Sequence, residues 1–235
     1  MIFSPVARSM ATCKFVHPFG ALISGPSQAG KSEFVKKFLD NLACMCDVRF
    51  DRILVYYGEF QPIYRKFPND KVKIEFFNRL PERNDYEINS LPKLLIIDDL
   101  MLESAKSDVI VNLFTKGCHH KNLSVFFIVQ NLFFQGKGLR TISLNCCYIV
   151  LFKSPRDKSQ VSCIARQICP ENPLFLQQAF SDATCIPYGY LLLDLRQETP
   201  ENFRFRSCIF PEDKFHFVYV PSLSSLSFSS SKNSR

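Results

Sequence analysis

The segment at residues 25–32 limits most strongly what this chain of 235 residues can fold into. It reads Gly-Pro-Ser-Gln-Ala-Gly-Lys-Ser and fits G-x-x-x-x-G-K-[ST], the Walker A loop that holds phosphates between a strand and a helix. The apolar run at 19–23 predicts a buried strand before the loop, and residues 33–39 have apolar side chains at helical spacing after it. This context favours a nucleotide-binding α/β domain over a glycine-containing turn that matches by chance.

The residue types in this loop fit phosphate chemistry. Glycines allow backbone conformations in which successive N–H groups point at phosphate oxygens, and the following helix adds the positive end of its dipole. Lys31 is expected to reach the β- and γ-phosphates, and the Ser32 hydroxyl to bind Mg²⁺. We therefore expect ATP and Mg²⁺ as ligands. The expected nucleotide-binding residues are Gly25, Pro26, Ser27, Gln28, Ala29, Gly30, Lys31 and Ser32.

A second landmark is the aliphatic run at 94–97, which leads directly into Asp98 and Asp99. This pattern predicts a buried parallel strand that ends at the functional edge of a sheet, the position of a Walker B motif. Asp98 is expected to hold Mg²⁺ and Asp99 to activate the attacking water, with Glu103 as the reserve candidate for the base. The alternative is a pair of carboxylates that cap a helix around Glu103.

Further apolar runs predict the remaining elements. Gln130 follows the strand expected at 123–129, where it suits a sensor of the γ-phosphate or the water better than simple strand termination. Aromatic residues at 15–19 either contact the base or, the preferred interpretation, belong to the core edge. The other expected elements are strands at 52–57, 72–77 (possibly a hairpin arm), 148–152, 188–195 and 203–210, and helices at 107–118, 158–168 and 172–184.

Three arginines are candidates for an arginine finger that completes a neighbouring subunit's site. Arg140 ends a glycine-containing segment at 132–140 that is expected to be a mobile loop, although a solvated connection fits nearly as well. Arg156 and Arg166 are the other candidates. At 203–210 apolar and cationic residues alternate, which predicts one wet, basic face on that strand.

Composition limits the class of protein less sharply. The net charge of +7 favours an anionic partner such as DNA without requiring one. Ten cysteines without a signal peptide indicate a reducing compartment, and we interpret them as buried thiols rather than zinc ligands because no C-x-x-C spacing occurs. No apolar run approaches the length of a membrane span. We expect a flexible segment at 1–14, a P-loop ATPase domain at 15–211 and a disordered Ser-rich tail at 212–235.

Several longer stretches resemble one family. The residues concerned are 111–125, 130–133, 135–138, 142–145, 152–160 and 187–190, with Asp194 on the strand that follows. Together they resemble the genome-packaging ATPases of Polinton/Maverick elements and related double-stranded DNA viruses, in the FtsK–HerA branch of P-loop ATPases. The resemblance covers 15–211, and it is far more specific than the Walker motifs alone.

The resemblance implies a RecA-like, mostly parallel sheet flanked by helices, here with a C-terminal β hairpin. It implies ATP hydrolysis by a homo-oligomeric ring that translocates double-stranded DNA into a preformed capsid, at a portal vertex, in the nucleus or cytoplasm of a host. By motif position it assigns Mg²⁺ to Ser32 and Asp98, and catalytic roles to Lys31, Asp99, Gln130 and Arg140.

This chain departs from the family at two places. Asp99 stands where FtsK–HerA enzymes commonly have Glu, and Gln28-Ala29 replaces small residues. Two alternatives belong to other classes of protein: a nucleoside or nucleotide kinase, and a domesticated, non-motor nucleotide-binding protein. A kinase of that kind usually has an Arg-rich lid, and the Asp98–Asp99 pair with Gln130 suits hydrolysis better.

Overall fold

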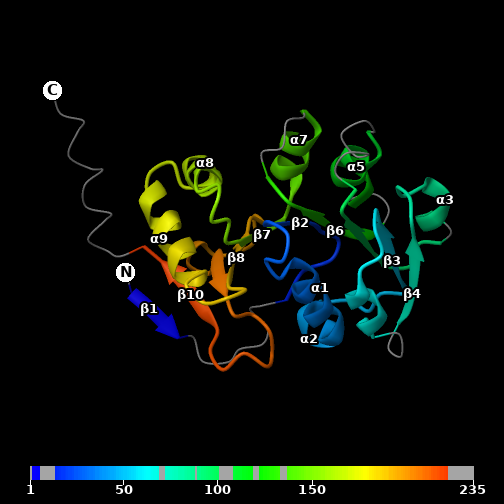
Figure 1. Ribbon diagram of the computed structural model, residues 1–235, viewed down its shortest axis with the longest axis horizontal. Coiled ribbons are helices and arrows are strands. Elements are labelled where there is room, and N and C mark those ends of the chain that lie inside the picture. Colours follow the sequence, from blue (N-terminus) through cyan, green and yellow to red (C-terminus); the bar gives the residue numbers. More distant parts are fainter. Residues whose placement is uncertain are drawn as a thin grey trace.

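A single central sheet organises the computed structural model, which describes residues 2–5, 14–68, 72–87, 89–100, 108–118, 122–132 and 137–221. Over these residues the strands form one ten-stranded sheet in the order β1-β10-β9-β8-β7-β2-β6-β5-β3-β4. Figure 1 shows the sheet crossing the molecule with helices on both of its faces. The predicted α/β class with a mostly parallel sheet is confirmed.

The parallel part of the sheet contains the strands that the apolar runs predicted. Except for the partly exposed edge strand, which contains Lys73 and Glu75, its strands are buried on both faces, and this explains why their sequences are nearly continuous aliphatic and aromatic runs. The segment after β3 forms a parallel strand beside it and not a hairpin arm. These strands are β2 (Gly20–Ser24), β3 (Arg52–Tyr57), β4 (Lys73–Phe77), β5 (Lys93–Asp98), β6 (Leu123–Val129) and β7 (Tyr148–Phe152).

The antiparallel part begins where β8 (Tyr190–Asp194) pairs with β7, and it contains the predicted hairpin of β8 and β9 (Phe205–Ser207). Two strands lie outside the domain bounds expected from the sequence. β10 (Phe217–Val220) lies beyond residue 211, and β1 (Ile2–Pro5) lies within 1–14. Both strands have only four residues, which is too short for a clear periodic signal in the sequence. The structure shows that β10 belongs to the domain, because Tyr219 is buried and its hydroxyl donates to Asp182 Oδ2 at 3.0 Å.

The expected basic face of β9 is wrong. Arg206 is buried, and its guanidinium donates to Asp194 Oδ2 on β8 at 2.7 Å. The Asp194 carboxylate also accepts from Arg196, which lies just beyond the end of its own strand. Alternation of cationic and apolar residues therefore reflects an internal ion pair here, because a buried carboxylate requires charged partners.

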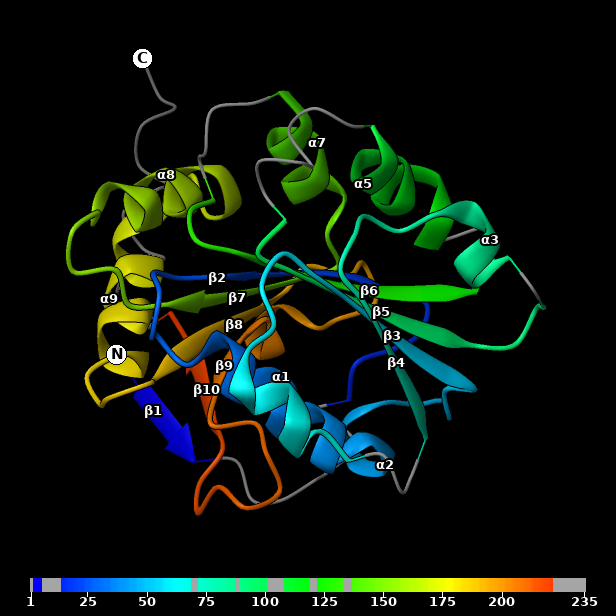
Figure 2. The same ribbon diagram turned by 45° about the vertical axis from the view of Figure 1, so that its right-hand side comes forward.

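The helices cover the two faces of the sheet. On one side lie α1 (Lys31–Asp40) and α2 (Leu42–Met45), and on the other α5, α7, α8 and α9, as the two views show (Figures 1 and 2). Two separate hydrophobic clusters fill the spaces between helices and sheet. The remaining elements are η2 (Pro62–Lys66), α3 (Arg83–Tyr86), α5 (Val109–Asn112), η3 (Leu113–Gly117), α7 (Lys137–Asn145), α8 (Ser159–Ile168), α9 (Pro173–Ala183) and η4 (Glu201–Phe203).

The aromatic residues before β2 belong to the core. Phe15 and Phe19 are fully buried beneath α1, where their rings contact Phe126 and Tyr148. The preferred interpretation of this segment is confirmed, and these rings are not available to a nucleotide base. Within the described parts of the chain, no helix combines the length and apolarity needed to cross a membrane.

Strand order brings the two Walker motifs to the same edge. β6 lies between β2, which leads into the Walker A loop, and β5, which ends at Asp98. Two backbone hydrogen bonds tie the loops after these strands together. The Gly25 N–H donates to Val129 O at 3.2 Å, and the Gly58 N–H donates to Asp98 O at 3.2 Å. The carboxyl ends of β2, β3, β5 and β6 therefore form one continuous edge.

Candidate active site

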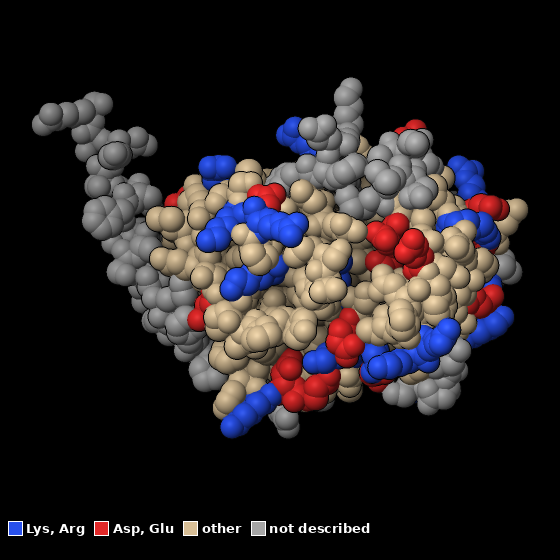
Figure 3. All heavy atoms as spheres, viewed as in Figure 1, with Lys and Arg blue, Asp and Glu red and all other residues tan. Residues whose placement is uncertain are grey.

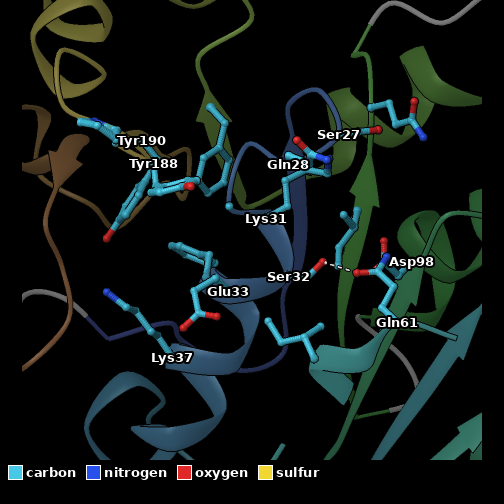
Figure 4. A pocket seen from close by; sticks show the side chains of 18 of the residues that line it. Ser27, Gln28, Lys31, Ser32, Glu33, Lys37, Gln61, Asp98, Tyr188 and Tyr190 are labelled. Atoms are coloured by element: carbon cyan, nitrogen blue, oxygen red, sulfur yellow. Dashed lines mark hydrogen bonds between the residues drawn. The ribbon is translucent and has the colours of Figure 1, made fainter. Parts of the chain in front are cut away.

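A cavity of about 860 Å³ opens at this edge. It is lined by the Walker A loop, the ends of β5 and β6, the start of η2 and the segment that leads into β8. Figure 4 shows Lys31 and Ser32 in its middle, with Gln61 and Asp98 on one side and Tyr188 and Tyr190 on the other. The cavity thus has two chemically different ends, joined by the loop.

The Walker A loop has the backbone that phosphate binding requires. Gly30 caps α1 with φ 104°, a left-handed conformation that L-residues with side chains adopt rarely. A Cβ on Gly25 would lie 2.6 Å from Phe152 Cβ, so this position also has no room for a side chain. Gln28 also adopts a left-handed conformation, with φ 65°, so the glutamine at this position is compatible with the turn. Lys31 begins α1 at the positive end of its dipole.

Lys31 folds back onto its own loop. Its Nζ donates to Gly25 O at 2.6 Å and to Pro26 O at 2.8 Å. Burial lowers the pKa of Lys31 from its ordinary value, and the negative charges of Asp98 and Asp99 partly oppose this effect. Carbonyl oxygens therefore hold the ammonium in the cavity. A phosphate, which has a full negative charge, attracts an ammonium more strongly than a carbonyl oxygen does.

Ser32 and Asp98 are linked through a residue that the sequence did not indicate. The Ser32 Oγ donates to Gln61 Oε1 at 3.0 Å, and Gln61 Nε2 donates to Asp98 Oδ2 at 3.2 Å (Figure 4). Tyr64 of η2 also donates its buried hydroxyl to Asp98 Oδ2, at 2.7 Å. Burial raises the pKa of Asp98, while the hydrogen bond from Tyr64 and the charge of Lys31 act in the opposite direction.

This pair of oxygen ligands fits Mg²⁺. A hydroxyl and a carboxylate are hard oxygen donors, and a cation between them would offset the desolvation cost of the Asp98 charge. The Gln61 amide spans the two oxygens, so a cation that joined Ser32 to Asp98 directly would have to displace it. Gln61 is thus positioned to respond to metal binding.

Asp99 and Gln130 come together from neighbouring strands. Gln130 Nε2 donates to Asp99 Oδ1 at 3.2 Å, and both residues line the cavity at its exposed margin. Asp99 adopts φ 57°, and a Cβ on Gly58 would lie 2.6 Å from Asp99 O. The turn after β5 is therefore tightly fixed against the end of β3. Glu103, the reserve candidate for the base, lies outside the described residues.

The three candidate arginines do not lie in the cavity. Arg140 on α7, Arg156 after β7 and Arg166 on α8 are all exposed. Among the described residues that line the cavity, the cations are Lys31 and Lys37, and no arginine occurs. An arginine that completes this site would therefore have to come from outside the described lining of the cavity.

The contribution of Tyr64 can be measured directly. Tyr64→Phe is expected to lower the free energy of unfolding by about 1–3 kcal/mol, because it leaves the buried Asp98 carboxylate with one hydrogen bond fewer. Tyr57→Phe is the matched control, since no described residue hydrogen-bonds its hydroxyl although it neighbours Tyr64. Urea unfolding of both variants without nucleotide tests this. Equal losses in the two variants would contradict the assigned hydrogen bond.

Comparisons with known proteins reveal relatives of the fold only. No family model matches the sequence, and no curated protein matches it. The structure is similar to the genome packaging NTPase B204 of Sulfolobus turreted icosahedral virus 2 in its complex with AMP, with a TM-score of 0.55, 16% identity and coverage of 78% of this chain and 96% of that chain. For the complex of B204 with ATP-gammaS the TM-score is 0.53 and the identity 14%, with coverage of 88% of this chain and 98% of that chain.

B204 from Sulfolobus Turreted Icosahedral Virus, described as a DNA-packaging ATPase, matches equally well, with a TM-score of 0.53, 14% identity and coverage of 88% of this chain and 98% of that chain. At such identities the likeness is one of fold. This chain has the α/β fold of P-loop NTPases, with a mostly parallel sheet and flanking helices.

Proposed function

We propose that this chain is an ATP-hydrolysing motor that translocates double-stranded DNA into a viral capsid, as do the FtsK–HerA-type packaging ATPases that its sequence resembles. The observation that carries the proposal is the cavity itself, which combines the phosphate-binding loop, the Ser32–Asp98 oxygen pair and the Asp99–Gln130 pair. The likeness of fold to a protein described as a genome packaging NTPase adds support. The specific resemblance to Polinton/Maverick elements belongs to the same proposal.

The geometry suggests a division of roles in hydrolysis. The backbone N–H groups of the loop bind the phosphates, and Lys31 leaves the carbonyls of Gly25 and Pro26 to contact the γ-phosphate. Magnesium, held by Ser32 and Asp98, would neutralise charge on the phosphate oxygens. Gln130 orients the attacking water, and Asp99 accepts a proton from it. The water oxygen forms a bond to the γ-phosphorus while the bond between the γ-phosphorus and ADP breaks.

A ring of subunits follows from the same proposal. The described lining of the cavity has no arginine, which is consistent with a finger supplied by a neighbour. Arg140, Arg156 and Arg166 are exposed and are the candidates, with Arg140 assigned by the resemblance. The assembled ring would act at the capsid portal vertex, in the nucleus or cytoplasm of the host cell or associated with the virion.

DNA contact would depend on charge rather than on base sequence. Figure 3 shows, on the face of the molecule seen in Figure 1, several separate groups of Lys and Arg side chains with acidic groups between them. The net charge of +7 supports attraction of a phosphate backbone. Because binding of this kind releases counterions, the affinity for DNA is expected to fall steeply as salt is added.

The decisive experiment is ATP hydrolysis by the purified protein with Mg²⁺, with and without long double-stranded DNA. Turnover that increases with DNA, and that is lost in the Lys31→Ala variant, is the expected result. Phosphate transfer to an added nucleoside would instead identify a kinase. Tight ATP binding without turnover in either condition would favour a non-motor nucleotide-binding protein. DNA-independent turnover that persists in the Lys31→Ala variant would not arise from this cavity and would contradict the proposal.

A further inference from the structure

We propose that the second end of the cavity binds the nucleobase, with a purine stacked on the exposed ring of Tyr188. This inference rests on the proposed function, since it names the part of the nucleoside triphosphate that this end receives. Tyr188, Tyr190 and Phe210 line this end together with Lys37 and Asp213. It is therefore aromatic with a few polar groups, as sites for planar ligands are.

The floor of this subsite is a rigid group of buried rings. The Phe34 ring centroid lies 5.0 Å from that of Tyr190 and 5.1 Å from that of Phe210, and Phe152 lies 5.7 Å from Tyr190. The Tyr190 hydroxyl accepts a hydrogen bond from the Ile209 N–H at 3.1 Å. Because these rings are packed and hydrogen-bonded, they form a preformed apolar surface that binding would not have to order.

Tyr188 differs from these rings because the core does not use it. Tyr188 is 72% exposed, although it lines the cavity. Its backbone has φ 61°, an uncommon and strained conformation for a residue with a side chain. The turn that imposes this conformation is closed by a hydrogen bond from the Gly189 N–H to Ile186 O at 3.1 Å. It places a large ring at the cavity, and that ring belongs to neither hydrophobic cluster of the core.

The neighbouring glycines fix that ring next to the phosphate loop. A Cβ on Gly30 would lie 3.3 Å from both Tyr188 Cβ and Tyr188 Cδ1, so the tyrosine lies directly against the Walker A loop. Gly189 lies so close to the end of α9 that a Cβ on it would be 2.4 Å from Ala183 O, and this close approach requires a glycine. The ring is therefore held within reach of a ligand whose phosphates occupy the loop.

The orientation of the ligand follows from the two ends of the cavity. Asp98 and Gln61 lie on one side of Lys31 and Ser32, and Tyr188 and Tyr190 lie on the other (Figure 4). A triphosphate with its γ-phosphate toward Asp98 must extend its nucleoside toward Tyr188. A purine is the expected base, because its two fused rings offer the larger face for stacking.

The test compares ATP with inorganic tripolyphosphate, which has the phosphates but no base. Calorimetric titration with Mg²⁺ is carried out on the unchanged protein, Tyr188→Ala and Tyr188→Phe, with Phe215→Ala as the control for an exposed ring (52% exposed) that does not line the cavity. We expect Tyr188→Ala to weaken ATP binding about ten-fold and tripolyphosphate binding not at all. Tyr188→Phe and Phe215→Ala should bind both ligands as the unchanged protein does.

The possible failures are distinguishable. If the unchanged protein binds tripolyphosphate as tightly as ATP, or if Tyr188→Ala leaves ATP affinity unchanged, the base subsite is wrong while the phosphate site stands. An equal loss for both ligands in Tyr188→Ala also overturns the inference, because the substitution would then act through the loop. If the unchanged protein binds neither ligand, the proposed function itself fails.

Discussion

Asp99→Asn is expected to lower the kcat of ATP hydrolysis by about 10²–10⁴-fold, while the affinity for nucleotide stays nearly unchanged. A carboxamide cannot accept the proton that the attacking water must lose. The substitution conserves shape, and its side-chain oxygen can still accept from Gln130. Single-turnover hydrolysis together with equilibrium nucleotide binding separates the chemical step from binding.

Glu103→Gln is the matched comparison for this prediction. If Asp99 is the base, this variant retains near-normal turnover. If only the Glu103 substitution abolishes hydrolysis, the assignment of Asp99 is wrong. A loss of nucleotide affinity in Asp99→Asn would also contradict it, because the residue would then contribute to binding rather than to the reaction.

Lys31→Ala is expected to reduce kcat/KM for ATP by at least about 10²–10³-fold, the loss typical when one preorganised group for developing charge is removed. Lys31 Nζ is bonded to loop carbonyls in the cavity, and among the described lining residues the other cation is Lys37, which lies nearly two helical turns further along α1. Steady-state kinetics with Mg²⁺-ATP measures the effect. Lys36→Ala is the control on the same helix, since Lys36 pairs with Asp40 and does not line the cavity.

Folding stability should not follow activity in this variant. Burial lowers the pKa of Lys31 from 10.5, so between the folded and unfolded pKa values the unfolded state binds more protons. The contribution of Lys31 to the free energy of unfolding therefore rises with pH in that window, and at neutral pH the buried ammonium is a cost. We expect the nucleotide-free Lys31→Ala protein to unfold at the same temperature or higher. Thermal unfolding well below that of the unchanged protein would contradict this.

Much of the fold could be predicted because the central strands of the sheet are buried on both faces. Runs such as the one at 94–97 are recognisable without neighbours, since every residue in them is apolar. The antiparallel edge was harder to predict. Arg206 has the sequence signature of a solvent-facing cation, and only the pairing of β8 with β9 brings its guanidinium to the buried carboxylate of Asp194.

The candidate site divides in the same way. Residues whose roles depend on a local motif, such as Lys31 and Asp98, could be placed from the sequence because loop, strand and helix are contiguous there. Gln61 and Tyr64 could not, since they follow an unrelated strand and meet Asp98 only because β3 lies beside β5. Tyr188 was part of a recognisable stretch, but nothing local indicated that it would lie against Gly30.

The hydrogen bonds from Gly25 to Val129 and from Gly58 to Asp98 have a consequence for how this edge opens. Each bond joins the residue after one strand to the last residue of the strand beside it, β2 to β6 and β3 to β5. Neither turn can therefore leave the edge without breaking a bond to its neighbour, and the amide protons of Gly25 and Gly58 are expected to exchange with solvent only when the corresponding pair of strand ends opens.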